Sequence, residues 1–145
     1  MKRSFIALLL IVLLAVCLCV SCNDGPAGGS SASGDKWVAN YTDTETGEGQ
    51  TIEASMTMTL VFDGNGKVTA TTYLKSMKLN GADYDISKMT KEQRTTVMTG
   101  TYTDSTITLT YTEQGQTKTT TGTYSISGNQ LTLTADDVTH VFTKQ

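Results

Sequence analysis

The chain has 145 residues, a formal net charge of −3 and a single histidine. A mildly acidic composition without a basic cluster argues against a nucleic-acid-binding protein, and one histidine leaves little for acid–base catalysis. We therefore expect a protein that is not an enzyme, binds no nucleic acid and needs no metal or other cofactor.

The beginning of the chain has the pattern of an export signal. Lys2 and Arg3 precede an apolar run from Phe5 to Val20, and Ser21-Cys22 follows it. A basic head, an apolar middle and a small residue before the cut are typical of a secretory signal peptide. The run of about 16 residues is shorter than the ~20 that a membrane-spanning helix needs, which favours cleavage over an uncleaved anchor. Losing Lys2 and Arg3 would change the net charge from −3 to −5.

The residue after the expected cut resembles the lipid-attachment site of bacterial lipoproteins. Cys17, Cys19 and Cys22 are the candidates, but only Cys22 follows a small residue, Ser21. The resemblance implies a signal peptide over residues 1–21, acyl chains such as palmitate on Cys22, and an outer-membrane lipoprotein of the cell envelope. Two or more acyl chains hold a protein on a membrane far more firmly than one. The mature chain would then contain one cysteine and could form no internal disulfide.

The composition changes after the signal. Residues 23–35 are rich in Gly, Ser and Ala and contain the only proline, Pro26, a composition typical of a flexible linker. We expect residues 22–35 to be the lipidated cysteine and its tether, and residues 36–145 to form one domain. About 110 residues is an ordinary size for a single domain.

The most regular part of the domain is the segment Thr51 to Phe62. Apolar and polar residues alternate along it, and a period of two predicts a half-buried strand rather than a helix. Asp63-Gly64-Asn65-Gly66 follows, and its glycines favour the positive φ angles of a tight hairpin turn. The apolar face of the predicted strand consists of Ile52, Ala54, Met56, Met58, Leu60 and Phe62.

Further strand and turn signals follow. Lys67 to Lys75 is rich in β-branched and aromatic residues, which predicts a second strand, and Asn80-Gly81 predicts a turn. Ser87 to Val97 contains several good helix formers, and its Thr90 and Gln93 have the spacing of a capping box. We expect one short helix in this segment.

The last third of the chain contains two similar units. Thr99–Tyr102 leads to Ile107–Thr110, and Thr121–Tyr124 leads to Leu131–Thr134, which predicts two similar hairpins. Val138–Thr143 closes the chain. Eight or nine short strands joined by short turns predict an all-β fold, namely an antiparallel up-and-down β-barrel of about eight strands, with a β-sandwich as the alternative. The expected turns lie at Gln114-Gly115, Gly128-Asn129 and Asp136-Asp137.

Three short motifs resemble the lipocalin-like domains of small lipoproteins of the Bacteroidetes. They are Gly34-Asp35-Lys36-Trp37, the turn Phe62–Val68, and Gly122–Leu133. The resemblance implies a lipocalin-like barrel over residues 36–145. Lipocalins pack the early tryptophan against an arginine late in the chain, whereas the only arginine after the expected cut is Arg94.

An eight-stranded barrel is either filled by its own side chains or able to hold one small ligand. Flexible methionines and tyrosines with polar tips suit an adaptable apolar pocket, and they suit an ordinary core equally well. Tyr124 is of interest because it shares a predicted face with Gly122, and a glycine beside an inward aromatic ring leaves room for a ligand. The candidate ligand-binding residues are Met56, Met58, Phe62, Tyr102, Tyr111, Tyr124 and His140.

Asp104-Ser105-Thr106 resembles the O-glycosylation sites of exported Bacteroidetes proteins. The tripeptide lies in a predicted turn, where an enzyme could reach the hydroxyl group of Ser105. We therefore expect Ser105 to be a glycosylation site.

Two functions are compatible with these features. The first is a lipid-anchored binding protein of the cell envelope whose barrel carries a small apolar ligand. The second is a barrel with a solid core that contacts other proteins or glycans through its loops. In both cases we expect a monomer that is held at the membrane by its N-terminal lipid.

Overall fold

The computed structural model of the protein describes residues 32, 34–47, 49–113 and 115–145. The expected signal peptide and Cys22 lie outside the described residues. Within these ranges the fold is all-β, with one 3-10 turn, η1 (Glu92–Arg94). The strands are β1 (Lys36–Gly47), β2 (Gln50–Phe62), β3 (Lys67–Leu79), β4 (Ala82–Tyr84), β5 (Thr95–Tyr102), β6 (Thr106–Glu113), β7 (Gln116–Ser127), β8 (Gln130–Ala135) and β9 (Val138–Lys144).

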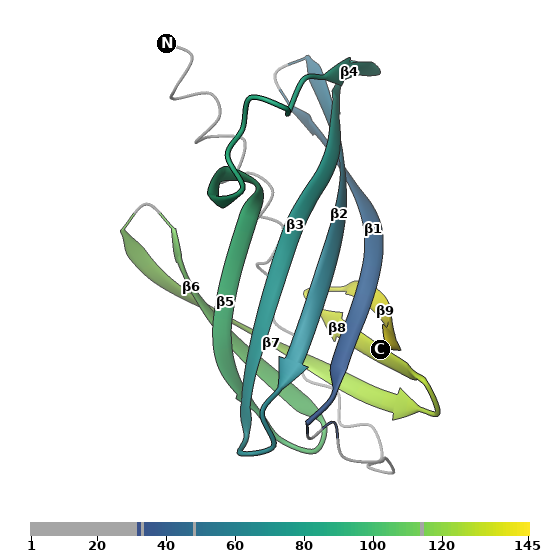
Figure 1. The fold of residues 1–145 in the computed structure, drawn as a ribbon, viewed down its shortest axis with the longest axis vertical. Coiled ribbons are helices and arrows are strands. Elements are labelled where there is room, and N and C mark those ends of the chain that lie inside the picture. Colours follow the sequence, from purple (N-terminus) through teal and green to yellow (C-terminus); the bar gives the residue numbers. More distant parts are fainter. Residues whose placement is uncertain (1–31, 33, 48, 114) are drawn as a thin grey trace.

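Eight of these strands close into an antiparallel barrel (Figure 1). Neighbours in the chain are neighbours in the wall, so its order is β1, β2, β3, β5, β6, β7, β8, β9 and back to β1. β4 is a short extra strand that pairs with the end of β3. The predicted up-and-down barrel is confirmed, and the β-sandwich alternative is wrong.

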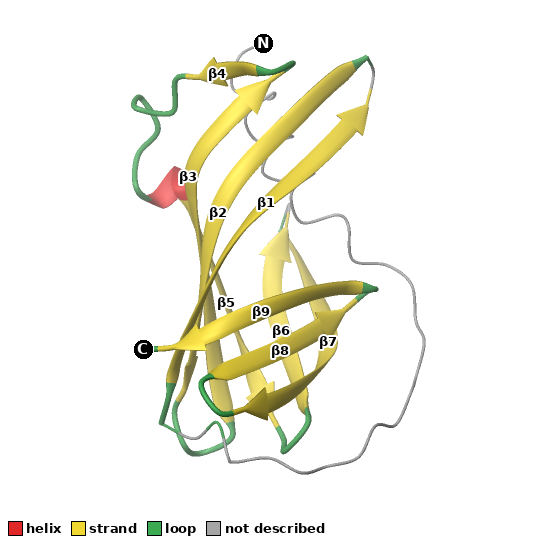
Figure 2. Ribbon diagram, turned by 90° about the vertical axis from the view of Figure 1, so that its right-hand side faces the viewer, coloured by secondary structure: helices red, strands yellow, loops and turns green. Residues whose placement is uncertain are grey.

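The barrel is closed unevenly. β1 and β2 pair along their full length, from Lys36 opposite Val61 to Gly47 opposite Gln50. β1 and β9, in contrast, share only the pairs Trp37 with Lys144 and Val38 with Thr143. Beyond Val38 these two strands diverge, as Figure 2 shows. We refer to this junction between β1 and β9 as the seam.

The predicted hairpin turns form where glycine, asparagine and aspartate occur. Gly64 and Gly66 both adopt φ 81°, which an L side chain tolerates poorly. The Asp63 carboxylate accepts the backbone N–H groups of Asn65 at 2.8 Å and Lys67 at 2.9 Å, and these bonds hold the pKa of Asp63 below its usual range. Positive φ angles also occur at the other predicted turns, at Asn80, Gly81, Gly115, Gly128, Asp136 and Asp137.

The short helix expected over Ser87–Val97 is reduced to the single 3-10 turn Glu92–Arg94. Its capping box is present, because the Thr90 N–H donates to Gln93 Oε1 at 2.8 Å and the Gln93 N–H donates to Thr90 Oγ1 at 3.3 Å. The three β-branched residues 95–97 then pair with β3 as the start of β5. β-branched residues favour strands, so strand pairing ends the helical turn.

The interior of the barrel consists of two regions. The packed end lies at the turns β2–β3, β5–β6 and β7–β8, and the cavity end at the turns β1–β2, β6–β7 and β8–β9. Trp37, Phe62 and Phe142 are at most 1% exposed and lie in the packed end. They belong to one continuous core with Ala32, Ala39, Leu60, Val68, Ala70, Met98, Ile107, Leu109, Tyr124, Leu131 and Leu133.

Residues before β1 contribute to the packed end. Ala32 is fully buried in the main core, although it precedes the expected start of the domain at Lys36. The Gly34 N–H donates to the Phe62 carbonyl at 3.1 Å, and the Phe62 N–H donates to the Asp35 carbonyl at 3.1 Å. The folded unit therefore includes residues assigned to the tether from sequence.

The first strand and the last strand also meet at the packed end. The Lys144 ammonium lies 5.8 Å from the ring centre of Trp37, within the range of a cation–π contact. The same ammonium forms an ion pair of 2.8 Å with Asp35. Arg94 instead lies over Tyr73, 5.3 Å from its ring centre. The cation on the early tryptophan is thus a lysine of the closing strand.

Candidate functional site

The cavity end of the barrel contains a cavity of about 410 Å³. This volume lies within the ~300–1,000 Å³ that is usual for small-molecule sites. Each of the eight barrel strands contributes at least one lining residue. The lining consists of Tyr41, Thr42, Asp43, Met56, Met58, Thr72, Thr96, Met98, Leu109, Tyr111, Thr120, Leu133, Ala135, Val138, Thr139 and His140.

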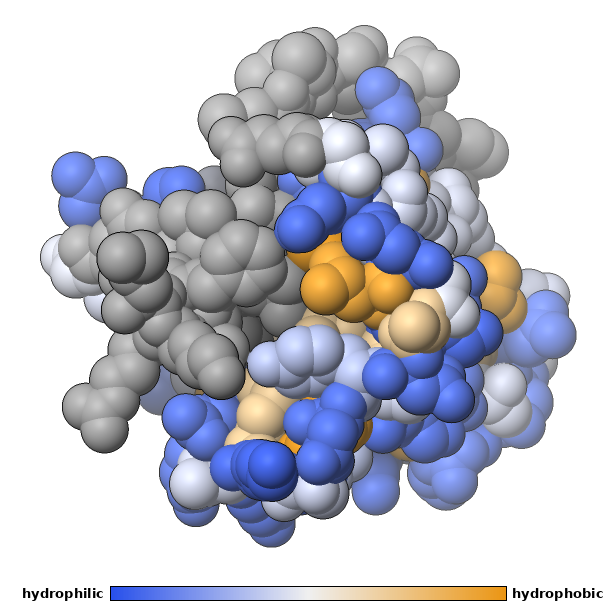
Figure 3. Space-filling model, turned by 90° about the horizontal axis from the view of Figure 1, so that it is seen from above, coloured by the Kyte–Doolittle hydropathy of each residue, from blue (hydrophilic) through white to orange (hydrophobic). Residues whose placement is uncertain are grey.

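Side-chain size and strand divergence together explain why this space is open. β3 and β5 line it with small or unbranched residues, Thr72, Thr96 and Met98, and β8 lines it with Leu133 and Ala135. β1 and β9 diverge here, because their backbone pairing stops near the packed end. In a view onto this end, apolar side chains gather near the middle of the face among hydrophilic ones (Figure 3).

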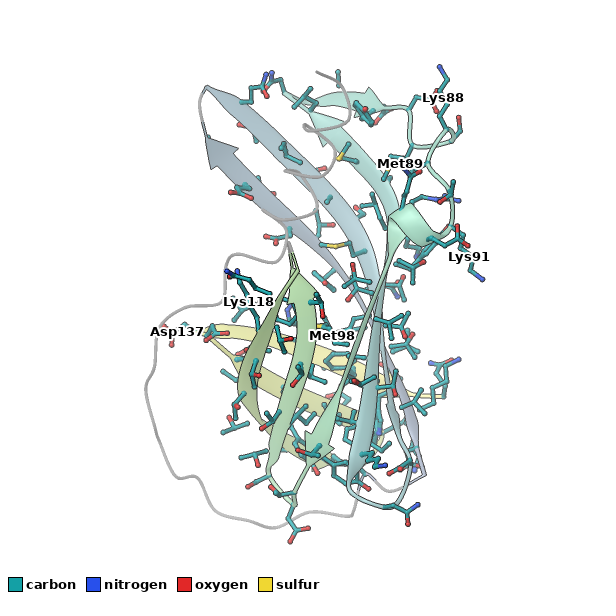
Figure 4. The ribbon with its side chains drawn as sticks, turned by 90° about the vertical axis from the view of Figure 1, so that its left-hand side faces the viewer. Lys88, Met89, Lys91, Met98, Lys118 and Asp137 are labelled. Atoms are coloured by element: carbon teal, nitrogen blue, oxygen red, sulfur yellow. The ribbon has the colours of Figure 1, made fainter. Side chains whose placement is uncertain are left out.

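The wall of the cavity is apolar and adaptable on the sides formed by β2, β5 and β6. Met56, Met58, Met98 and Leu109 line these sides. Met98 points into the barrel, whereas Lys88 and Lys91 of the loop before β5 point away from it (Figure 4). Methionine has three rotatable side-chain bonds and fills irregular spaces, so this wall can adjust to the shape of an apolar ligand.

A second apolar cluster packs beside the cavity. Met89, from the loop between β4 and η1, is buried with Ala54, Met56 and Leu74. Ile86 of the same loop and Tyr41 of β1 pack against this cluster. Because Met56 and Tyr41 also line the cavity, the loop packs against residues of the cavity wall.

The carboxylate and the imidazole of the lining, Asp43 and His140, lie at the seam. The rings of Tyr41 and His140 are 4.5 Å apart, with an angle of 51° between them, so side chains bridge β1 and β9 where backbone pairing has stopped. Burial lowers the pKa of His140, and the nearby Asp43 opposes this shift. On β7, the Thr120 hydroxyl donates to a carboxylate oxygen of Asp136, in the β8–β9 turn, at 3.2 Å.

The seven residues predicted to bind a ligand divide into two groups. Met56, Met58, Tyr111 and His140 line the cavity. The other three belong to the packed end: Phe62 contacts Tyr102 edge to face at 4.8 Å, and its ring centre is 5.9 Å from that of Tyr124. The structure therefore brings four of the seven together around an open space and places the other three in or against the solid core.

The predicted space beside Tyr124 does not exist. A side chain at Gly122 would place its Cβ 2.9 Å from the Thr134 carbonyl oxygen and 3.0 Å from Leu133 Cδ1, so β8 fills the room that the glycine leaves. The Tyr124 hydroxyl donates to the Thr103 carbonyl at 2.6 Å, and burial raises the pKa of Tyr124. Tyr124 holds the β5–β6 turn onto β7.

Several lining residues were not among the predicted ones. Tyr41 and Asp43 are the most important, because they supply a ring and a carboxylate. The signal that identifies them is the alternation along β1, where Trp37 and Ala39 are buried and the next inward positions are 41 and 43.

The other predicted sites have different outcomes. Ser105 lies in the β5–β6 turn and is half-buried, and its carbonyl accepts the Tyr124 N–H at 2.7 Å; its glycosylation stays a prediction. Among the described residues, no group of three or more His, Cys, Asp and Glu side chains could hold a metal ion. Nor does any helix in this part of the chain have the length and apolar character needed to cross a membrane.

Comparison with known proteins adds no family to these observations. No protein-family model, no curated protein and no solved structure matches the chain.

Proposed function

We propose that this protein is a lipid-anchored barrel of the bacterial cell envelope that carries a small apolar ligand. The observation that supports the proposal is the cavity of about 410 Å³, which is lined by three methionines and by residues of all eight barrel strands. Such a cavity could bury most of a small molecule, and the solid packed end closes it from below.

The anchor and the lipocalin-like ancestry belong to the same proposal. Ser21-Cys22 after an apolar run supports lipid attachment at Cys22. The packing of Lys144 on Trp37 supports the resemblance to lipocalins, with lysine in place of the late arginine. A monomer held by its lipid would present the cavity to apolar molecules of the envelope.

Binding of a neutral apolar dye, N-phenyl-1-naphthylamine, tests the carrier function. We expect saturable binding of the dye by the purified chain with micromolar affinity, and a rise in melting temperature by mass action. Met58→Trp and Thr72→Trp place a large ring in the cavity and should each weaken binding at least about tenfold. Val61→Trp adds the same ring on β2, at a position that is 44% exposed, and should bind like the wild type.

Two results would contradict the carrier function. One is the absence of saturable binding by a wild-type chain that melts cooperatively. The other is unchanged binding by both cavity variants, which would place the dye elsewhere on the chain. Either result would favour the alternative, a barrel that contacts proteins or glycans through its loops.

The anchor is tested separately. Cells that express the Cys22→Ser variant and receive a fatty-acid analogue should contain an unlabelled precursor, because neither Cys17 nor Cys19 follows a small residue. Labelling of this variant at the wild-type level would move the attachment site to one of the other two cysteines.

A further inference from the structure

Few charged groups occur among the residues that line the cavity. Among the described residues that line it, the only carboxylate is Asp43, the only imidazole is His140, and there is no lysine or arginine. A second carboxylate, Asp136, lies just behind the lining and accepts a hydrogen bond from Thr120. Lys118 of β7 pairs with Tyr111, but it is exposed and is not among the lining residues. A ligand held by the lining residues would therefore meet the Asp43 carboxylate and no lysine or arginine among them.

The seam also provides aromatic faces. Tyr41 and His140 contact each other there, and Tyr111 lines the cavity from β6. The faces of aromatic rings carry negative charge density and attract ammonium groups. Threonine hydroxyls at positions 42, 72, 96, 120 and 139 add hydrogen-bonding groups to the same lining.

Asp43 is held in place by its own backbone. Its Oδ1 atom accepts the N–H of Thr44 at 2.9 Å, so the carboxylate has a defined position on β1. His140 on the opposite side of the seam supplies no compensating charge at neutral pH, because burial lowers its pKa.

We infer that the cavity selects an apolar ligand with a cationic head group, with the ammonium beside Asp43 and the rings of Tyr41 and Tyr111, and the apolar part against Met58, Met98 and Leu109. This inference rests on the proposed carrier function and names its ligand class. A fatty acid at the same position would place its carboxylate beside Asp43 with no positive partner among the lining residues, and a buried unpaired charge is costly.

Competition with three amphiphiles of equal chain length tests the inference. Dodecylamine, dodecanol and dodecanoate, each below the concentration at which it self-associates, are titrated against bound N-phenyl-1-naphthylamine at pH 7 and low salt. An alkylamine is protonated at this pH, as lysine is. We expect dodecylamine to displace the dye at concentrations about tenfold or more below those of the other two.

Three variants assign the preference to Asp43. Asp43→Asn keeps an oxygen that can accept the Thr44 N–H but removes the charge, and it should lose the preference for the amine while it still binds the neutral dye. Asp43→Glu should retain much of the preference. Asp104→Asn makes the same change in net charge in the β5–β6 turn at the packed end and should behave like the wild type.

The possible failures are distinguishable. Saturable dye binding with equal displacement by all three amphiphiles, or strongest displacement by dodecanoate, would overturn the cationic-head inference and leave the carrier function standing. A preference that survives in Asp43→Asn would overturn the assignment to Asp43. Absence of dye binding by the folded wild type would overturn both the carrier function and the inference.

Discussion

The same eight strands build two different interiors in this barrel. At the packed end, rings from β1, β2 and β9 (Trp37, Phe62 and Phe142) are at most 1% exposed and meet side chains from the other strands. At the cavity end, the strands turn methionine, threonine and alanine inward and leave about 410 Å³ open. Under the proposed carrier function, the packed end would supply stability and the cavity end would supply binding, so that the residues around the cavity could be chosen for a ligand.

The two ends also close the seam differently. At the packed end, β1 and β9 are joined by backbone pairing, by the Lys144–Trp37 contact and by the Lys144–Asp35 ion pair. Nearer the cavity, the contact between the rings of Tyr41 and His140 bridges them. Side chains can change rotamer more easily than a strand ladder can open, so under the proposed carrier function we expect a ligand to enter at the seam.

The largest difference between the two ends should appear on truncation of an inward side chain of β2. Phe62→Ala removes a ring that is 1% exposed and should lower the free energy of unfolding by about 3–5 kcal/mol. Met58→Ala removes atoms that already border a cavity, and it should cost less than about 2 kcal/mol. Urea unfolding of both variants measures the two losses. Equal losses would mean that the cavity end is as tightly packed as the other.

Two glycines in strands differ in how much space surrounds them, and so in the expected cost of adding a side chain. A side chain at Gly100 would place its Cβ 1.8 Å from the Thr108 carbonyl oxygen, whereas at Gly47, on the β1 side of the cavity end, no atom lies within 4 Å. Gly100→Ala should therefore cost at least about 1–3 kcal/mol, because β5 and β6 must separate. Gly47→Ala should stay within about 0.5 kcal/mol of the wild type. Thermal unfolding distinguishes them, and a harmless Gly100→Ala would show that the two strands are not in close contact in solution.

Local patterns in the sequence are sufficient to predict much of the fold. The alternation from Thr51 to Phe62 identifies the inward face of β2, on which Ala54, Met56, Leu60 and Phe62 are buried. Glycine and Asx pairs identify the turns because only such residues adopt positive φ without strain. The repeat Thr-Gly-Thr-Tyr predicts the β5–β6 and β7–β8 hairpins, and both of its glycines, Gly100 and Gly122, lie where a neighbouring strand leaves no space for a side chain.

The division of inward residues between core and cavity could not be predicted in this way. Tyr111 and Tyr124 are both inward tyrosines on the neighbouring strands β6 and β7, yet one lines the cavity and the other is 7% exposed in the core. What separates them is the position along the barrel and the divergence of β1 from β9, which depend on pairings between distant segments. The predicted short helix is reduced to one turn for a related reason, because pairing of residues 95–97 with β3 overrides local helix signals.

The smallest effect that we expect is on the pH dependence of stability, to which one residue from each end contributes. Burial holds the folded-state pKa of His140 below its unfolded value of ~6.5, so the unfolded chain binds the extra proton first and stability is lost as pH falls below that value. Tyr124 has a raised pKa in the folded state, so stability is lost as pH rises past its unfolded value of ~10. His140 at the cavity end thus lowers the stability of the fold in mild acid, and Tyr124 at the packed end lowers it in strong alkali.

Urea unfolding of the wild type, His140→Gln and Tyr124→Phe across this pH range measures both effects. His140→Gln should lose less stability than the wild type between pH 7.5 and 5.5, and Tyr124→Phe should lose less above pH 10. Three carboxylates also have a lowered pKa, but they change stability at lower pH than His140 does, so they do not obscure its effect. They are Asp63, Asp85 and Glu92. Parallel curves for the wild type and His140→Gln would mean that the imidazole is solvated in solution. The seam would then already be open to water without a ligand, and the ring contact between Tyr41 and His140 would not close it.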